Sequence, residues 1–396
     1  MLRIMLCRIT IVVALAAWAG AAQAVTFSVT DLRAIGAAQG AEFANAAAIS
    51  PDGTQIVGTM RFSAGGFYHE RAFLYADDTL TNLHSFDGRD DTYATGVNNA
   101  GHVVGWISVY HDENSGPGFY VHPFLNTGGA SVTLPYDGAE VYSINTSDQI
   151  SGQHLEFGTG VEHLLLCEAD GSSSYLSTSG VDVWNEGIND DGWVVAWGHT
   201  QSPDPYAIVN RPTSLGRVSI DLGHIPDGEE VHPLDINNDG MVVGGGMTGA
   251  ASIEHAFLSV VDGEGYSTPI DLGTLSEGMG NWSRAQAINN YGWIVGSGSR
   301  GALPARGFLA IDSGSGYEEL LDLNDLLRSS DQSLWTIEDA IDVADTGQIL
   351  GVARDAGGGL HSVLLTPVPE PSALALLAIG GIGVLGFVRR ARVPGP

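Results

Sequence analysis

The chain contains no lysine, and its basic residues are few. Sixteen arginines stand against 46 acidic residues, so the formal net charge of the 396-residue chain is −30 at pH 7. A surface of that sign repels nucleic acid and anionic lipid, and we expect no nucleic-acid partner. It favours divalent cations and neutral or basic partners, and it also helps to keep an exported protein in solution.

Cysteine is almost absent as well. Cys7 lies in an N-terminal apolar segment, which leaves Cys167 as the only cysteine in the remaining chain. A single cysteine excludes an intramolecular disulfide. Because Cys167 ends the apolar run 163–167, we predict that it is a buried small hydrophobic residue.

The motifs of several enzyme classes are missing. Residues 25–366 contain no Gly-x-Ser-x-Gly elbow, no phosphate-binding Walker loop and no dinucleotide-binding glycine motif. These absences favour a non-catalytic protein. A hydrolase or lyase acting on polysaccharide stays open as an alternative, because paired carboxylates leave no sequence signature and their separation is a three-dimensional property.

Apolar runs with a sustained helical period are also lacking in the central part of the chain, which argues against helical repeats. The chain is instead rich in glycine, with 54 residues, and one glycine-containing phrase recurs seven times. The closing positions of the copies lie 44 to 55 residues apart, a period typical of stacked supersecondary units. The copies occupy residues 49–58, 97–105, 144–152, 188–196, 236–244, 288–296 and 343–351.

Each copy has the pattern of a β-hairpin. An apolar residue and asparagine end one strand, a segment such as Asn-Asn-Asp-Gly forms the turn, and a β-branched pair with glycine begins the next strand. A second phrase follows every copy and a third follows several, which makes about four short strands per unit, as in a propeller blade. The second phrase lies at 71–74, 122–125, 162–165, 206–209, 255–258, 306–309 and 361–364, and the third at 83–84, 221–223, 271–273 and 321–323.

The two ends of the repeat array predict a closed ring. Residues 27–33 look like the third phrase alone, and residues 361–366 supply the second phrase without the third. The N-terminal strand can therefore complete the last blade and remove an exposed sheet edge. We predict an all-β fold, a seven-bladed β-propeller over residues 25–366 that is closed by pairing of the N-terminal strand in the last blade. An open β-solenoid is the competing geometry.

Residues 1–24 have the three parts of a secretory signal peptide. Arg3 and Arg8 form a basic N-terminal region, an apolar stretch spans residues 9–19, and Ala22 and Ala24 form a small-residue cleavage site. We predict an N-terminal signal helix that is removed after Ala24, and export of the protein through the inner membrane.

The C-terminal segment, residues 367–396, has a different composition. A Val-Pro-Glu-Pro motif precedes 16 apolar residues, 373–388, a stretch slightly short for a free-standing span of about 20 residues. Arginines follow, and they would hold that end in the cytoplasm. The plain interpretation is a short transmembrane helix that anchors the chain, at least transiently, in the inner membrane. The motif is Val368, Pro369, Glu370 and Pro371, and the basic cluster is Arg389, Arg390 and Arg392.

This order of motif, short apolar helix and basic cluster resembles the PEP-CTERM sorting signal of Gram-negative bacteria. The resemblance covers about 25 residues. It implies that an exosortase, a membrane protease-transpeptidase, recognises the Pro-Glu-Pro motif and processes the tail. Proteins of this kind are associated with exopolysaccharide, so the resemblance also implies a location at the cell surface or in the extracellular matrix.

The repeats carry a second resemblance. The phrase His-Ala-Phe-Leu at residues 255–258, together with Ile-Asn-Asn-x-Gly-x-Val-Val-Gly, is similar to the HAF repeat of bacterial extracellular proteins. That resemblance covers most of residues 49–366. It supports the fold and the extracellular location, and it implies no reaction.

Two groups of residues are candidates for ligand binding. Four tryptophans fall near predicted loops, where an indole on a propeller face would stack against a sugar ring; packing inside the protein is the alternative. Three aspartates form an acidic loop that could hold Ca²⁺, the one cofactor that the sequence suggests; a solvated acidic loop is the alternative. The tryptophans are Trp106, Trp184, Trp282 and Trp335, and the aspartates are Asp87, Asp90 and Asp91.

Other recurring polar residues are expected to be structural. Residues 235–240 match the first half of a calcium-loop pattern, but Gly246 stands where the pattern needs glutamate, so we predict a β-turn. Three histidines share one slot in three blades, and equivalent positions on separate blades lie too far apart to bind one metal. They are His122, His255 and His361.

Together these features predict an exported, non-catalytic propeller of the cell surface or matrix. We expect it to act as a binding or structural module, with exopolysaccharide as a candidate partner and an exosortase-like enzyme as its processing partner. A polysaccharide-active hydrolase or lyase is one alternative, and a Ca²⁺-stabilised structural surface protein is another.

Overall fold

The computed structural model describes most of the chain between residues 25 and 368. The segments outside this description are 1–24, 39, 65–66, 87–89, 110–119, 157–159, 170, 177–182, 200–204, 227, 229–230, 250–252, 263–264, 277–280, 302–303, 315, 318 and 369–396. The expected signal helix and the expected apolar tail helix therefore lie outside the described residues. No helix among the residues described is long and apolar enough to span a membrane.

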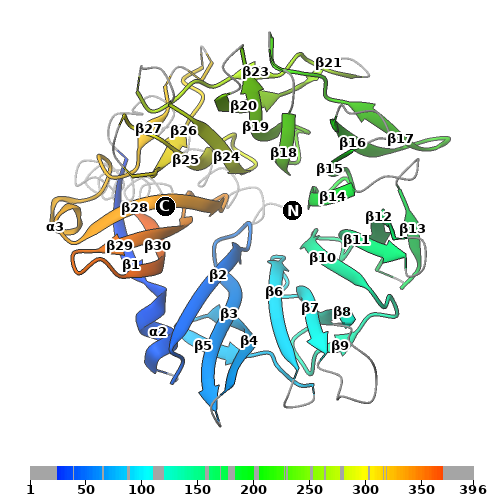
Figure 1. Cartoon of the computed structure of the whole chain (residues 1–396), viewed down its shortest axis with the longest axis horizontal. Helices are drawn as coiled ribbons and strands as arrows, with labels where there is room; N and C mark the ends of the chain where they lie inside the picture. Colours follow the sequence, from blue (N-terminus) through cyan, green and yellow to red (C-terminus); the bar gives the residue numbers. More distant parts are fainter. Residues whose placement is uncertain are drawn as a thin grey trace, which may run out of the picture.

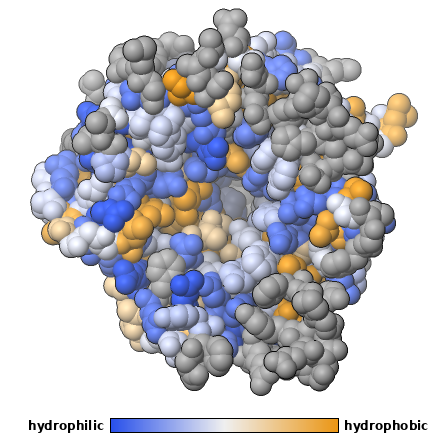
Figure 2. All heavy atoms as spheres, viewed as in Figure 1, coloured by the Kyte–Doolittle hydropathy of each residue, from blue (hydrophilic) through white to orange (hydrophobic). Residues whose placement is uncertain are grey.

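Seven four-stranded antiparallel sheets stand around a central axis, and blades that follow one another in the chain are neighbours in the ring (Figure 1). The space-filling view shows a hollow at the centre of this ring (Figure 2). The predicted seven-bladed propeller is thus confirmed, and the alternative of an elongated solenoid is excluded. Each blade is a meander in which the first strand lies next to the axis and the fourth at the rim.

Blades 1 to 3 consist of β2 (Phe43–Ile49), β3 (Gln55–Ala64), β4 (Phe67–Ala76) and β5 (Thr79–Asn82); β6 (Asp91–Val97), β7 (Val103–Val109), β8 (Tyr120–Asn126) and β9 (Val132–Thr133); and β10 (Ala139–Ile144), β11 (Ile150–Glu156), β12 (Val161–Cys167) and β13 (Ser173–Tyr175). Blades 4 to 6 consist of β14 (Val183–Ile188), β15 (Val194–His199), β16 (Pro205–Thr213) and β17 (Gly216–Asp221); β18 (Val231–Ile236), β19 (Val242–Thr248), β20 (Ile253–Ser259) and β23 (Ile270–Asp271); and β24 (Ser283–Ile288), β25 (Ile294–Gly298), β26 (Arg306–Ala310) and β27 (Leu321–Asp322).

Blade 7 is built from both ends of the chain. It consists of β28 (Trp335–Val343), β29 (Ile349–Asp355), β30 (Leu360–Val368) and β1 (Thr26–Asp31). Three smaller elements lie outside the blades: a hairpin of β21 (Val261–Asp262) and β22 (Gly265–Tyr266), and the short helices α2 (Leu32–Ala38) and α3 (Ser329–Gln332).

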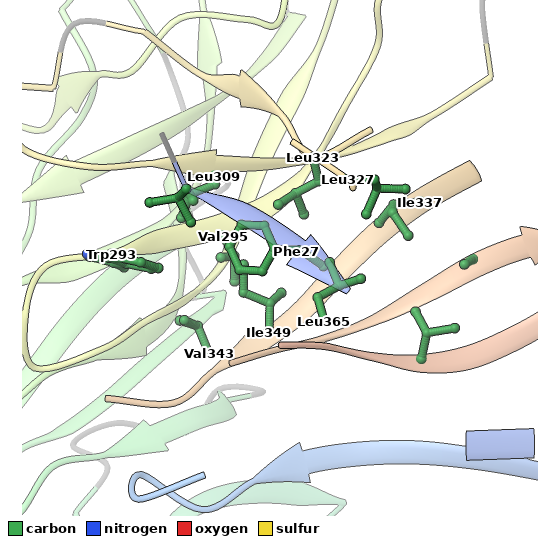
Figure 3. Packing of buried hydrophobic residues seen from close by; sticks show 14 of the residues in the cluster. Phe27, Trp293, Val295, Leu309, Leu323, Leu327, Ile337, Val343, Ile349 and Leu365 are labelled. Atoms are coloured by element: carbon green, nitrogen blue, oxygen red, sulfur yellow. The ribbon is translucent and has the colours of Figure 1, made fainter. Parts of the chain in front are cut away.

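The N-terminal strand closes the ring as predicted. β1 pairs antiparallel with β30 from Thr26 opposite Val368 to Asp31 opposite Val363. On its other side, the Phe27 N–H donates to the carbonyl of Leu326 at 2.8 Å, so both edges of β1 are held. The Phe27 ring is fully buried among apolar side chains of the last two blades (Figure 3). Closure therefore has a hydrophobic as well as a hydrogen-bonded basis.

Each repeated phrase forms the turn between the first and second strands of a blade. The turn glycine adopts positive φ, for example 72° at Gly192, a region that other residues rarely enter. In the third copy, which lacks this glycine, Asp148 adopts φ of 61° in its place. The closing glycine has a different function: at Gly105, a Cβ atom would collide with the carbonyl oxygen of Tyr93 on the neighbouring strand.

The core consists of apolar clusters that lie mainly between adjacent blades. One cluster joins Val104 of blade 2 to Val141 and Cys167 of blade 3. Cys167 is buried and free of any disulfide, as the sequence predicts. Burial raises the pKa of its thiol to about 12, so this cysteine is an unreactive packing residue.

Every inner strand contains a bulge two positions before its last apolar residue. One residue at each bulge has no partner on the second strand, and a bulge of this kind re-aims a side chain. All seven bulge residues line the central cavity. They are Ala47, Thr95, Tyr142, Glu186, Leu234, Gln286 and Ile341.

Candidate functional site

A cavity of about 240 Å³ lies on the axis of the ring. It extends from the bulges to the turns that carry the repeated phrase, and polar groups make up much of its wall. We call this the turn end of the channel. The other end is formed where the inner strands begin, because each first strand runs toward its turn; we call it the mouth.

The turn end is bound together by a belt of buried asparagines. The first asparagine of each of five copies donates its side-chain N–H to a backbone carbonyl of the next blade, at 2.9–3.1 Å. Its Oδ1 accepts two backbone N–H groups of its own turn, as at Asn237, where the donors are Asp239 and Met241. The five residues are Asn98, Asn145, Asn189, Asn237 and Asn289, and none is more than 5% exposed.

A second belt lies one residue further along the turn. The backbone N–H of Asp190 donates to Asn238 in the next blade, and the Asn238 side chain donates back to Asp190 at 2.8 Å. Between blades 6 and 7, Asn290 donates both its backbone N–H and its side-chain N–H to the carboxylate of Asp345. The two blades that lack the first asparagine are joined to their neighbours by other contacts. Asp345 donates its N–H to Pro51 at 2.7 Å.

These contacts correct the role expected of the repeated asparagines. The sequence predicted turn residues, and that prediction accounts for the bonds made by Oδ1. It missed the bond that each side-chain N–H makes to the adjacent blade. The recurrence of the same amide in copy after copy was the available signal, because a turn alone also accepts aspartate or glycine. The turn end is therefore used to hold the ring together.

Two aspartates inside the channel also join blades. Asp235 follows the bulge of blade 5 and accepts the N–H groups of Ile236 and, in blade 6, Ile288, at 2.7 and 2.8 Å. Asp342 makes the same pair of bonds between blade 7 and Ile49 of blade 1. Burial raises the pKa of Asp235 to about 7 and that of Asp342 to about 6. Both carboxyls thus titrate near neutral pH.

The mouth differs from the turn end because its residues change from blade to blade. In every blade one residue of the first strand lies directly opposite one residue of the second strand at this level. We call these the mouth pairs. They are Asn45 with Thr59, Tyr93 with Trp106, Glu140 with Gln153, Trp184 with Trp197, His232 with Gly245, Arg284 with Ser297, and Asp339 with Val352.

Aromatic rings stack within two of the mouth pairs. The rings of Tyr93 and Trp106 lie 4.0 Å apart at 23°, and those of Trp184 and Trp197 lie 4.4 Å apart at 24°. The His232 ring of blade 5 lies 4.3 Å from that of Trp197. Aromatic groups from blades 4 and 5 thus lie side by side at the mouth.

Carboxylates accompany the second stack. The indole N–H of Trp197 donates to Glu186 at 2.9 Å, and the Tyr142 hydroxyl donates to Glu140. Burial raises the pKa of Glu186 to about 7, although the Trp197 donor and the charge of Arg284 oppose the shift. Burial, the bond to Glu140 and nearby carboxylates raise the pKa of Tyr142, so it stays a neutral donor. We call Glu140, Tyr142, Trp184, Glu186, Trp197 and His232 the acid–aromatic cluster.

The four predicted sugar-stacking tryptophans lie on four different blades. Trp106 and Trp184 belong to mouth pairs and are half-buried. Trp335 meets the His361 ring edge to face at 5.2 Å. Trp282, also half-buried, donates its backbone N–H to the Ser299 hydroxyl, and its carbonyl accepts the backbone N–H of Ser299. Sequence reasoning overlooked Trp197. Its distance from Trp184 around the hairpin places the two opposite each other, and this spacing was the signal that could have found it.

The predicted acidic loop is partly within the described structure. Asp91 accepts the backbone N–H of Glu70 at 2.9 Å and lies 3.7 Å from the Arg71 guanidinium. Asp90 is buried and its carbonyl accepts from Arg71, while Asp87 lies outside the described residues. No group of three or more His, Cys, Asp or Glu side chains among the described residues could hold a metal ion. The calcium site stays a prediction.

The three equivalent histidines each bind an aspartate. His255 bonds to Asp271 and His361 bonds to Asp31, each within 3.0 Å. In both cases the aspartate lies in the outermost strand of the blade that contains the histidine. His122 bonds to Asp137 at 2.8 Å. The three histidines stabilise separate blades, as their spacing predicted. Asp235 likewise belongs to a strand and not to a calcium loop, and the residues after it form the expected turn.

The residues of the sorting motif lie where the described part of the chain ends. Val368 ends β30 opposite Thr26, so the motif begins inside the closing sheet. Pro369, Glu370 and Pro371, the arginines at 389, 390 and 392, and the cleavage-site residues Ala22 and Ala24 all lie outside the described residues.

Residues 367–392 match the family model of the PEP-CTERM protein-sorting motif. The chain therefore carries this motif, which marks an exported protein that an exosortase-type system sorts to the cell surface of Gram-negative bacteria. No curated protein matches the chain.

Several solved structures share the fold. The chain is similar to the β-propeller domain of the Trilobed protease from Pyrococcus furiosus, described as having an open velcro topology, with a TM-score of 0.55 and 8% identity over 84% of this chain and 98% of that one. It is also similar to prolyl oligopeptidase B from Galerina marginata, with a TM-score of 0.51 and 9% identity over 83% of this chain and 52% of that one. A third similar structure is that of a puromycin hydrolase, with a TM-score of 0.51 and 14% identity over 83% of this chain and 53% of that one.

The chain thus spans about half the length of the last two proteins. At such low identities the likeness concerns the fold alone.

Proposed function

We propose that this protein is a non-catalytic binding module of the cell surface or extracellular matrix, and that it binds a polysaccharide at the mouth of its channel. The sorting motif supports the location. The proposal adds that the mature protein remains associated with the exopolysaccharide around the cell, and that an exosortase-like enzyme and the inner membrane are only its transient partners.

The observation that carries the proposal is the stacking of aromatic side chains in two mouth pairs beside polar groups. Stacked, half-buried aromatic rings offer flat apolar surface, while neighbouring carboxylates and hydroxyls accept or donate hydrogen bonds; carbohydrate has both kinds of surface. The turn end lacks this combination, because its amides and carboxylates already bond to neighbouring blades.

Retention on polysaccharide tests the proposal. The exported protein, collected in its processed form, is passed over matrix polysaccharide from the producing cells and over a panel of immobilised glycans, with Ca²⁺ and with EDTA. We expect retention on at least one polymer, and a Trp184→Ala, Trp197→Ala double variant should elute without delay. Absence of any retention under both conditions would contradict a binding role.

The same experiment separates binding from catalysis. Product release is followed in the flow-through as reducing ends and as unsaturated sugars. We expect none, because the proposal assigns no reaction. Turnover of any polymer would replace the binding module with the hydrolase or lyase alternative. Retention that disappears with EDTA would instead favour a Ca²⁺-dependent protein.

A further inference from the structure

The mouth has two halves that neutralise their carboxylates differently. On one side, glutamates pair with arginines: Arg284 with Glu254 at 2.6 Å and Arg354 with Glu338 at 2.7 Å. Arg61 pairs with Glu70 in blade 1 in the same way. The charges of these three pairs, which lie in blades 5 to 7 and in blade 1, cancel. Asp339 of blade 7 lies at the same level, and burial raises its pKa and so disfavours its charged form.

In the part of the chain that the structure describes, the two glutamates of the acid–aromatic cluster bond to neutral donors instead of to arginines. Glu186 accepts from the neutral indole of Trp197, and Glu140 accepts from the neutral hydroxyl of Tyr142. A neutral donor fixes a carboxylate in place and leaves its negative charge intact. Arg284 acts on Glu186 only at longer range, and its guanidinium is already bound to Glu254. Blades 3 and 4 therefore present two carboxyl groups, held in place next to stacked indoles, that bond to no arginine and that a bound cation would favour in the ionised form.

This combination selects a particular ligand chemistry. Indole faces attract cations and also contact the apolar face of a saturated ring. Carboxylates held in a half-buried site form strong hydrogen bonds with an ammonium group. A neutral sugar would use the rings and leave the charges unpaired, and an acidic sugar would be repelled. A ring that carries a free ammonium group satisfies both features.

We propose that the acid–aromatic cluster binds a protonated amino sugar, as found in a polysaccharide whose amino groups are not acetylated. This inference rests on the proposed function and specifies its ligand. The sugar ring lies against the indoles of Trp184 and Trp197, and its ammonium group donates to Glu186 and Glu140. The arginine-paired half of the mouth takes no part in charge recognition.

Titration calorimetry with three probes tests the ligand class. The exported protein is titrated with a glucosamine tetramer, with the N-acetylglucosamine tetramer and with spermine, which carries ammonium groups but no ring. We expect the glucosamine tetramer to bind at least tenfold more tightly than either of the others. N-acetylation removes the charge and retains the ring, whereas spermine retains charge and lacks the ring.

Matched variants locate the site. Glu186→Gln keeps an oxygen that can accept from Trp197 and removes only the charge, so binding of the glucosamine tetramer should weaken at least tenfold. Glu140→Gln gives a second, independent loss of charge, should the first variant fold poorly. Glu338→Gln is the control from the arginine-paired half and should bind as the parent does.

The outcomes separate this inference from the proposed function. Equal binding of the acetylated tetramer overturns the amino-sugar assignment and leaves a polysaccharide-binding module standing. Equal binding of spermine overturns it as well, in favour of a simple amine site. Unchanged binding by both glutamine variants places the ligand elsewhere. A protein that retains no polysaccharide at all contradicts both proposals.

Discussion

The two ends of the channel are built from the same seven repeats and serve different purposes. At the turn end the residues are alike from blade to blade, and their polar groups bond across blade junctions. At the mouth each blade contributes a different pair of residues. A contact that closes a ring has to be made at every junction, whereas a ligand contacts only some blades. Repetition therefore marks the scaffold, and variation within the repeat marks the candidate site.

The same contrast holds within the mouth. Glu140 and Glu186, in blades 3 and 4, accept hydrogen bonds from aromatic side chains. The glutamates at positions 254, 338 and 70, in blades 5, 7 and 1, pair with arginines. A symmetric scaffold thus carries an asymmetric surface. Because of this asymmetry, the sector formed by blades 3 and 4 differs chemically from the rest of the ring.

The largest effect that we expect is a loss of stability when a residue of the turn end is changed. Asn237→Ala removes one buried bond to Asn289 in the next blade and leaves the partly buried N–H groups of Asp239 and Met241 without their acceptor. We expect the free energy of unfolding to fall by about 2–4 kcal/mol, because each buried unsatisfied group costs about 1–3 kcal/mol. Urea unfolding measures this.

The matched control for that variant lies at the mouth. Trp184→Phe keeps an aromatic ring and should change stability far less than Asn237→Ala, while it weakens retention on polysaccharide. Asn237→Ala should retain polysaccharide normally below its melting temperature. If both variants lost stability and binding to the same extent, the division between scaffold and site would be wrong.

Much of this architecture follows from the sequence alone. The recurring phrase fixed the blade count, and the incomplete phrases at residues 27–33 and 361–366 identified the closing strands. The glycine pattern located the turns. These features are local in sequence, and local chemistry is sufficient to recognise a hairpin.

The mouth was harder to predict because its contacts join residues from different strands and blades. Trp197 bonds to Glu186 of the preceding strand and meets His232 of the following blade. The bulge that turns Glu186 toward the axis depends on a one-residue shift in register between Asn185 and Gly187. Only two of the seven inner strands have glycine directly after the bulge, so glycine does not mark this feature across the repeats. Spacing could place Trp184 opposite Trp197, but not beside a carboxylate.

A second prediction concerns how stability depends on pH at the two ends of the channel. The pKa values of Asp235, Asp342 and Glu186 are raised to about 7, 6 and 7, above the values near 4 of an unfolded chain. Between pH 4 and pH 7 these three groups bind more protons in the folded state than in the unfolded state. Their contribution to stability is therefore largest at low pH and is lost as the pH rises toward 7. We expect the melting temperature to fall between pH 4 and pH 7 and to level off above.

The chain offers a natural substitute for testing this pH dependence. Ser143 occupies in blade 3 the slot that Asp235 occupies in blade 5. Asp235→Ser should therefore reduce the fall in melting temperature between pH 4 and pH 7, and Glu186→Gln at the mouth should do the same independently. If the melting temperature of the parent protein rose between pH 4 and pH 7, its pH dependence would instead be governed by carboxylates whose pKa is lowered in the folded state, such as Asp271.

The smallest expected effect distinguishes the two aromatic stacks. Tyr93 and Trp106 stack as closely as Trp184 and Trp197, but a carboxylate is bound to an indole only in the second pair. If stacking surface alone governed affinity, Trp106→Phe and Trp184→Phe would weaken binding of the glucosamine tetramer equally. We expect Trp184→Phe to weaken it a few-fold and Trp106→Phe to leave it within twofold, as measured by calorimetry. The difference arises because the ammonium group holds the sugar ring over blade 4, where Glu186 and Glu140 lie.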